Sequence, residues 1–68
     1  MFVYPKNGQS PDQQDRDRYE CHTWAASQTG FDPTLAGGGV PPDQLAAKTD
    51  AYNRAITACL QGRGYSVQ

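Results

Sequence analysis

The stretch PPDQLAAKTDAYNRAITACL, residues 41–60, decides the fold of this chain. Its larger side chains recur at spacings of four, three, four, three and one, in the order Leu45, Thr49, Tyr52, Ile56, Cys59 and Leu60. Residues with this period lie on one face of an α-helix, and a proline such as Pro42 is tolerated in a first helical turn. The stretch therefore predicts an amphipathic helix over about 42–61, with Gly62 or Gly64 as its stop.

Another helix is predicted upstream, over about 11–28. Ser10 is a suitable N-cap, Pro11 fits the first helical position, and Gln13 would complete a capping box. The first half of this helix carries charged residues at helical spacing, which indicates a mostly solvent-exposed face. The packing residues fall in its second half, on one stripe: Cys21, Trp24 and Ala25.

The remaining segments are a loop and two short ends. Residues 30–41 are rich in glycine and proline, with three consecutive glycines, and predict a flexible connection between the helices. Residues 2–4 and 65–67 are β-prone runs next to turn residues. We expect these ends to pair as a minimal two-stranded β-ladder, which needs the helices behind it to be stable.

The two cysteines, Cys21 and Cys59, fall on the inward stripes of the two predicted helices. Cys21 lies roughly 12 Å before the end of the first helix and Cys59 roughly 25 Å after the start of the second. A bridge therefore requires helices that are offset or crossed, and the loop is long enough to allow this. We predict a disulfide, which would support a small core. Two buried free thiols and metal or redox use are the alternatives.

Composition indicates one small domain and argues against two kinds of partner. The chain has 68 residues, 37% of them hydrophobic, and a net charge of −1. Its basic residues are scattered, which argues against nucleic acid binding. No apolar run reaches membrane-spanning length, so we expect no membrane insertion by this chain. Residues 1–68 are predicted to form a mainly α-helical domain, an offset two-helix hairpin stapled by one disulfide with a β-ladder between the termini.

Few residues suit a chemical site. His22 is the only histidine, and with Cys21 and Cys59 it could supply three zinc ligands. Adjacent helical residues point about 100° apart, however, and converge poorly on one ion. We find no convincing nucleophile–base pair or phosphate loop, and expect no enzyme activity, cofactor or metal. Tyr19 and Trp24 are aromatics of the kind favoured at interfaces, and with His22 they form the candidate partner-binding surface.

Ordered motifs at both ends of the chain match a known pattern. The front motifs are Tyr4-Pro5, Gly8-Gln9-Ser10, Gln13-Gln14, Tyr19-Glu20-Cys21, Trp24-Ala25 and Gln28-Thr29-Gly30-Phe31-Asp32-Pro33. The tail motifs are Tyr52-Asn53-Arg54-Ala55, Ala58-Cys59-Leu60 and Gly62-Arg63-Gly64-Tyr65-Ser66-Val67. Together they resemble the flanking halves of small uncharacterised Gram-negative envelope proteins of the glycine-zipper type. Residues 34–42 hold no zipper, so zipper-mediated membrane insertion is not carried over. The resemblance implies export and a Cys21–Cys59 bridge.

The leading hypothesis is a periplasmic or secreted structural or interaction domain, without catalytic activity, that presents a surface to a protein partner in the cell envelope. Its native signal peptide would have been removed, and Met1 would be an expression start. The rival hypothesis is a thiol-based redox or metal-sensing domain that uses Cys21, His22 and Cys59. A monomer and a domain-swapped dimer both agree with the flexible loop.

Overall fold

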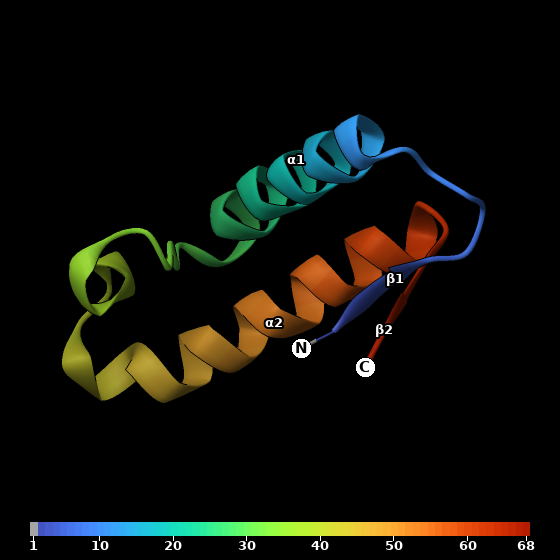
Figure 1. The fold of residues 1–68 in the computed structure, drawn as a ribbon. Coiled ribbons are helices and arrows are strands. Elements are labelled where there is room, and N and C mark those ends of the chain that lie inside the picture. The colour runs from blue at the N-terminus through green and yellow to red at the C-terminus, as the bar shows by residue number, and fades with distance from the viewer. Residues whose placement is uncertain (1) are drawn as a thin grey trace.

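The computed structural model describes residues 2–68, which form two helices, two short strands and two 3₁₀ turns (Figure 1). In chain order these are β1 (Val3–Pro5), α1 (Pro11–Thr29), η1 (Ala36–Gly39), η2 (Pro42–Gln44), α2 (Leu45–Gly62) and β2 (Tyr65–Val67). The predicted helical hairpin with a disulfide and a terminal ladder is confirmed. Met1, the expected expression start, lies outside the described residues.

Helix α1 begins at Pro11, as predicted, and ends at Thr29, one residue after the predicted end. The Ser10 side chain accepts a hydrogen bond from the backbone N–H of Gln13 at 3.2 Å, which satisfies one free donor of the first turn. Gly30 follows the helix with a φ of 74° and donates its N–H to the carbonyl of Ala26, as a left-handed cap does. The second bond of the predicted capping box, from the Ser10 N–H to the side-chain oxygen of Gln13, does not form. That oxygen accepts from Arg16 instead, and the Gln13 amide donates to Asp17.

Helix α2 begins three residues later than predicted. Pro42–Gln44 form a 3₁₀ turn, and the α-helix runs from Leu45 to Gly62. Such tight turns are frequent where an α-helix starts. On the exposed side of the helix, Asp50 and Arg54 form an ion pair one turn apart, with 2.9 Å between their charged atoms.

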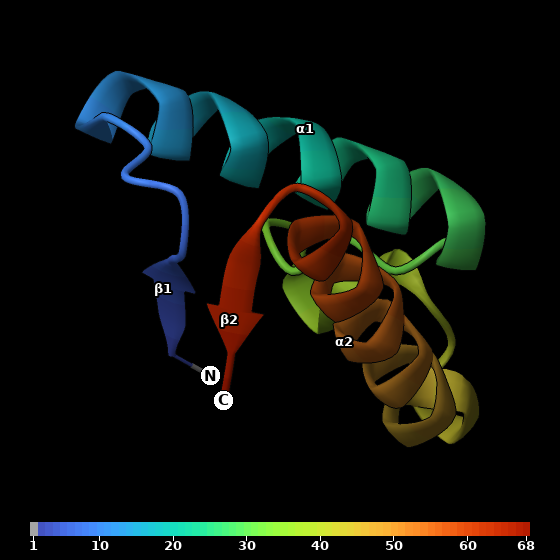
Figure 2. The same ribbon diagram turned by 90° about the vertical axis from the view of Figure 1, so that its right-hand side faces the viewer.

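The two chain ends pair as an antiparallel ladder. Val3 lies opposite Val67 and Pro5 opposite Tyr65, so β1 lies one residue later than the predicted 2–4. Figure 2 shows the ladder beside the C-terminal end of α2, with α1 crossing over both. The side chain of Gln9 donates to the carbonyls of residues 63 and 64 and so ties the N-terminal loop to the end of α2.

The core consists of two small clusters between the helices. One contains Cys21, Leu60 and Tyr65, and the other contains Ala25, Phe31 and Tyr52. The Cys21–Cys59 disulfide joins the helices at the first cluster, with 5.6 Å between the Cα atoms. The connecting loop carries the chain past the end of α1 before α2 begins (Figure 1), which is the predicted offset.

Trp24 does not belong to this core, although the sequence placed it on the packing stripe. Cys21 and Ala25 are fully buried, whereas Trp24 is 46% exposed. The reason is its position in the helix: three residues beyond Cys21 correspond to about 300° of rotation. The indole therefore lies beside the contact with α2 and not within it.

The Gly/Pro loop is packed as well as glycine-rich. Gly38 is buried and has a φ of 67°, a left-handed conformation that favours glycine. Its carbonyl accepts the N–H of Asp32 at 2.9 Å, and the ring of Phe31 covers the place where a β-carbon would be. A loop predicted from composition as a flexible connection thus contains one residue with a steric requirement.

We expect Gly38→Ala to destabilise the fold by about 2 kcal/mol, because it combines left-handed strain with overpacking against Phe31. Gly37→Ala is the matched control. It has a similar φ of 59° but open space where its β-carbon would lie, so only about 1 kcal/mol of strain is expected. Urea unfolding of both variants measures the difference. Equal losses for the two variants would contradict the packing of Phe31 on Gly38.

Candidate functional site

Two of the three predicted surface residues lie together on the outer side of α1. Tyr19 is 70% exposed and Trp24 46%. With polar neighbours they surround a shallow hollow of about 410 Å³. We call this surface the aromatic face; its residues are Tyr19, Glu20, Thr23, Trp24, Ser27 and Arg63. The four polar members were not singled out from the sequence, and Arg63 reaches the face from beyond the end of α2.

His22 lies apart from the aromatic face, so the predicted three-residue surface is separated into two places. Its Nδ1 atom is 2.8 Å from the hydroxyl of Tyr52, and its Nε2 atom is 3.8 Å from a carboxylate oxygen of Asp32. The side chain is only 25% exposed. His22 therefore links α1 to α2 and to the loop, which makes it a structural residue in this fold.

The groups around His22 have shifted acidities. Burial raises the pKa of Tyr52, and the nearby charge of Asp32 adds to this effect. Hydrogen bonds from the hydroxyl and backbone N–H of Thr34 lower the pKa of Asp32. Asp32 thus carries its negative charge beside the ring of His22.

A buried carboxylate, Asp17, organises the other end of the hairpin. Asp17 is only 4% exposed. It accepts hydrogen bonds from the hydroxyl of Tyr65 at 2.6 Å, the amide of Gln13 at 2.9 Å and the guanidinium of Arg63 at 3.0 Å. Arg63 also pairs with Glu20. The expectation that the first half of α1 is mostly a solvent-exposed face is wrong at this residue.

The hydrogen bonds of Asp17 shift the acidities of the network. The bond from Tyr65 is the main cause that lowers the pKa of Asp17, with Gln13 and Arg63 acting in the same direction. Burial, together with the bond to Asp17, raises the pKa of Tyr65 to about 12. Hydrogen bonds with Glu20 and Asp17 raise the pKa of Arg63. At neutral pH the network therefore holds an ionised Asp17 beside the neutral phenol of Tyr65.

This network fixes the position of Arg63 at the edge of the aromatic face. Arg63 is 38% exposed and is held by Asp17 and Glu20 at the edge of the face. The sequence did contain a signal for the burial of Asp17. Asp17, Cys21 and Ala25 stand four residues apart, and all three are buried. A stripe at that spacing includes the aspartate on the inward face.

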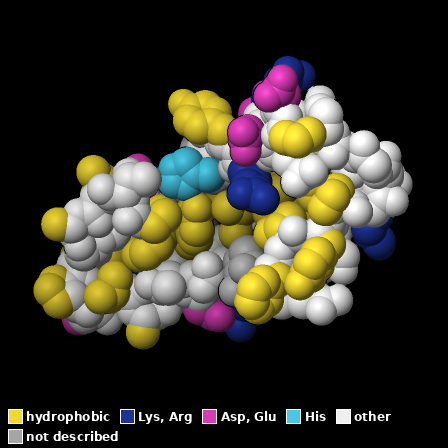
Figure 3. All heavy atoms as spheres, in the orientation of Figure 1, with side chains coloured by type: hydrophobic (Ala, Val, Ile, Leu, Met, Phe, Trp, Pro, Cys, Tyr) yellow, Lys and Arg dark blue, Asp and Glu magenta, His cyan; other side chains and the backbone are white. Residues whose placement is uncertain are grey.

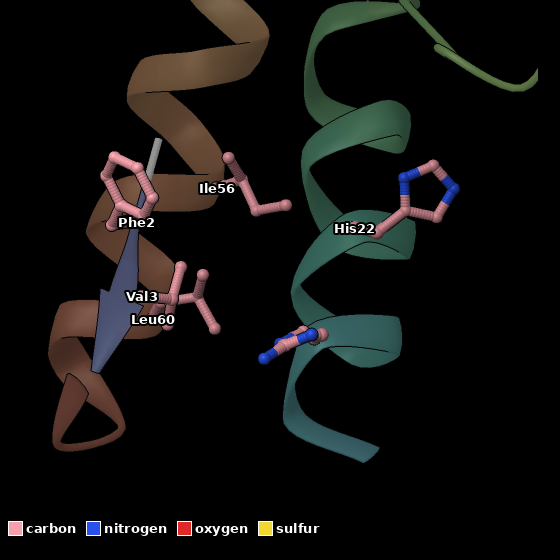
Figure 4. A pocket seen from close by; sticks show the side chains of 6 residues that line it. Phe2, Val3, His22, Ile56 and Leu60 are labelled. Atoms are coloured by element: carbon pink, nitrogen blue, oxygen red, sulfur yellow. The ribbon is translucent and has the colours of Figure 1, made fainter. Parts of the chain in front are cut away.

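A second hollow lies on another side of the molecule. It has a volume of about 480 Å³ and combines residues from β1, α1 and α2 (Figure 4). We call it the apolar hollow; its residues are Phe2, Val3, Arg18, His22, Ile56 and Leu60. Figure 3 shows apolar side chains gathered along the face between the two helices. Apart from His22, none of these residues was proposed as a site from the sequence.

The cysteines and His22 do not assemble as a ligand set. Cys21 is fully buried and bonded to Cys59, while both nitrogen atoms of His22 face Tyr52 and Asp32. Among residues 2–68, no group of three or more histidine, cysteine or acidic side chains is placed to hold a metal ion. Across the same part of the chain, no helix has the length and apolar character needed to cross a bilayer.

Comparison with known proteins assigns no family to the chain. Neither a protein-family model, nor a curated protein, nor a solved structure matches the chain.

Proposed function

We propose that this chain is a periplasmic or secreted interaction domain, without catalytic activity, that presents its aromatic face to a protein partner in the cell envelope. The observation that carries the proposal is the contrast between the two sides of α1. One side is fixed to α2 by the Cys21–Cys59 disulfide, while the other exposes Tyr19 and Trp24. Aromatic side chains on a rigid support are typical anchors of protein interfaces.

The cysteine chemistry supports the proposed compartment. Disulfides form and persist in oxidising environments such as the periplasm and the extracellular space, and are rare in the cytosol. The likeness of the chain's motifs to the flanking halves of glycine-zipper envelope proteins favours the same location.

A non-catalytic role is proposed because the described residues that could do chemistry have other partners. Ser10 caps α1, the two sulfur atoms are joined, and His22 contacts Tyr52. The hydroxyl–base contacts that do occur within residues 2–68 serve the fold. Tyr52–His22 and Tyr65–Asp17 join separate elements, and Thr34–Asp32 closes a turn of the loop.

Photo-crosslinking in the native host tests the aromatic face. A benzophenone amino acid at position 19 should give one discrete adduct in the envelope fraction, because this position lies at the proposed contact. The same amino acid at position 54 is the control, since the side chain of Arg54 is 81% exposed on α2 and lies outside the aromatic face. Trp24→Ser should weaken the adduct at position 19 without lowering the melting temperature by more than a few degrees. Equal adducts at both positions would contradict the proposal.

A further inference from the structure

The apolar hollow has the size and walls of a small-molecule site. Its volume of about 480 Å³ lies within the range of roughly 300–1,000 Å³ that is usual for ligand pockets. Val3, Ile56 and Leu60 supply aliphatic walls from β1 and α2 (Figure 4). Phe2 stands at its edge with 67% of its surface exposed. An apolar occupant would remove this surface from water, which is favourable.

One positive charge in this hollow has no counterpart. Arg18 lines the hollow, and within residues 2–68 it makes no salt bridge or side-chain hydrogen bond. By contrast, Arg54 pairs with Asp50, and Arg63 pairs with Asp17 and Glu20. The occupant that complements these walls is therefore apolar along its length and anionic at one end.

His22, the other polar residue that lines the hollow, does not offer its ring nitrogens to an occupant. Both ring nitrogens of His22 are turned to partners outside the hollow, Tyr52 and Asp32. His22 therefore acts as part of the wall, and Arg18 is the residue that selects the headgroup.

The ladder beside the hollow disfavours an extended peptide as the occupant. The backbone groups of Phe2 and Lys6 bond across to β2 and its flanking residues, so in an antiparallel pair those of Val3 and Pro5 face the free edge. Pro5 has no N–H to donate, which leaves Val3 alone with a free edge donor in β1. A prolyl residue on an edge strand hinders the addition of another strand. A ligand that needs no backbone pairing fits this edge better.

We propose that the apolar hollow binds a single-chain fatty carboxylate, with the hydrocarbon chain against Phe2, Val3, Ile56 and Leu60 and the carboxylate at Arg18. This inference goes beyond the aromatic face and does not depend on it. The two surfaces share no residue, so each can fail without the other.

Calorimetric titration of the disulfide-bonded 68-residue chain with hexanoate, octanoate and decanoate, each below the concentration at which it forms micelles, tests the proposal. The affinity should rise by up to about fourfold for each added methylene, as burial of hydrocarbon predicts. The stoichiometry should be one ligand per chain. In NMR spectra, the shifted signals should be those of the residues that line the apolar hollow.

Two variants and their controls locate the site. Arg18→Gln should weaken decanoate binding by about fivefold and leave binding of uncharged 1-decanol unchanged, whereas Arg16→Gln, on the same helix but outside the hollow, should change neither. Phe2→Ser should weaken the binding of decanoate and of 1-decanol by about tenfold, because it removes an apolar wall. Leu35→Ser is its control, since Leu35 is a similarly exposed apolar residue, 56% exposed, in the loop.

Three outcomes would overturn the proposal. The first is an affinity that does not depend on chain length. The second is binding to vesicles of anionic phospholipid without binding to monomeric decanoate, which would indicate a membrane surface as the partner. The third is a concentration-dependent dimer that Phe2→Ser abolishes, which would assign the hollow to a second copy of the chain.

Discussion

Reduction of the Cys21–Cys59 disulfide is expected to lower the melting temperature by about 15–30 °C. The cysteines are 38 positions apart in the chain, and a loop of this length is worth about 4 kcal/mol in the chain-entropy account of cross-links. For a domain of this size each kcal/mol corresponds to about 4–8 °C. The total stability expected of a chain this short is only about 3–10 kcal/mol, so the reduced chain should be close to unfolding. Circular dichroism melts with and without reductant measure the change.

The double variant Cys21→Ala/Cys59→Ala separates the cross-link from the other effects of the reductant. It should melt near the temperature of the reduced chain, and reductant should have no further effect on it. If the oxidised and reduced chains melt within a few degrees of each other, the core alone holds the helices together and the disulfide is not the staple of this fold.

Asp17→Asn is expected to lower the melting temperature by about 15 °C, because the hydrogen bonds of a buried carboxylate to three donors are lost or reversed. The amide cannot accept from Tyr65, Gln13 and Arg63 together, and its own N–H groups would face these donors. Asp15→Asn is the matched control, since Asp15 is an exposed acid on the same helix, and it should change the melting temperature by no more than a few degrees. Thermal melts at neutral pH compare the two variants.

The same carboxylate predicts how stability depends on pH. Its pKa is lower in the folded chain than the ordinary value of 3.8, so its contribution is fully present well above that value. The contribution is lost as the pH falls below about 4 toward the lowered pKa. The wild type should therefore lose more stability between about pH 5 and pH 2 than Asp17→Asn does, as read from urea unfolding at each pH. Parallel curves for the two proteins, or equal melting temperatures for the Asp17 and Asp15 variants, would contradict the network.

The secondary structure and the disulfide could be predicted because their signals are local. The helical period of residues 45–60 and the Ser10 cap are each set by residues close together in the chain. Cys21 and Cys59 lie on the inward stripes of two amphipathic helices, which brings them together once the helices pack. The β-ladder followed from two short β-prone ends, and only its register was one residue off on the N-terminal strand.

The site could be predicted only in part because its contacts join distant parts of the chain. Asp17 meets Tyr65 across 48 residues and Arg63 across 46, and no local pattern sets those pairs. His22 was grouped with Tyr19 and Trp24 as a surface residue, but its contact with Tyr52, 30 residues away, turns it inward.

The steric role of Gly38 had a similar cause. A run of glycines indicates backbone freedom, whereas the burial of Gly38 depends on where the ring of Phe31 packs. The apolar hollow likewise needs β1, α1 and α2 in place before Arg18 and Phe2 come near each other.

The most direct test of the central claim is the intact mass of the chain isolated from its native host, after alkylation without and then with prior reduction. The account of a stapled domain in an oxidising compartment predicts no alkylation without reductant and two alkyl groups per chain after reduction. Two alkyl groups without reductant would contradict it, because both thiols would then be free in the cell.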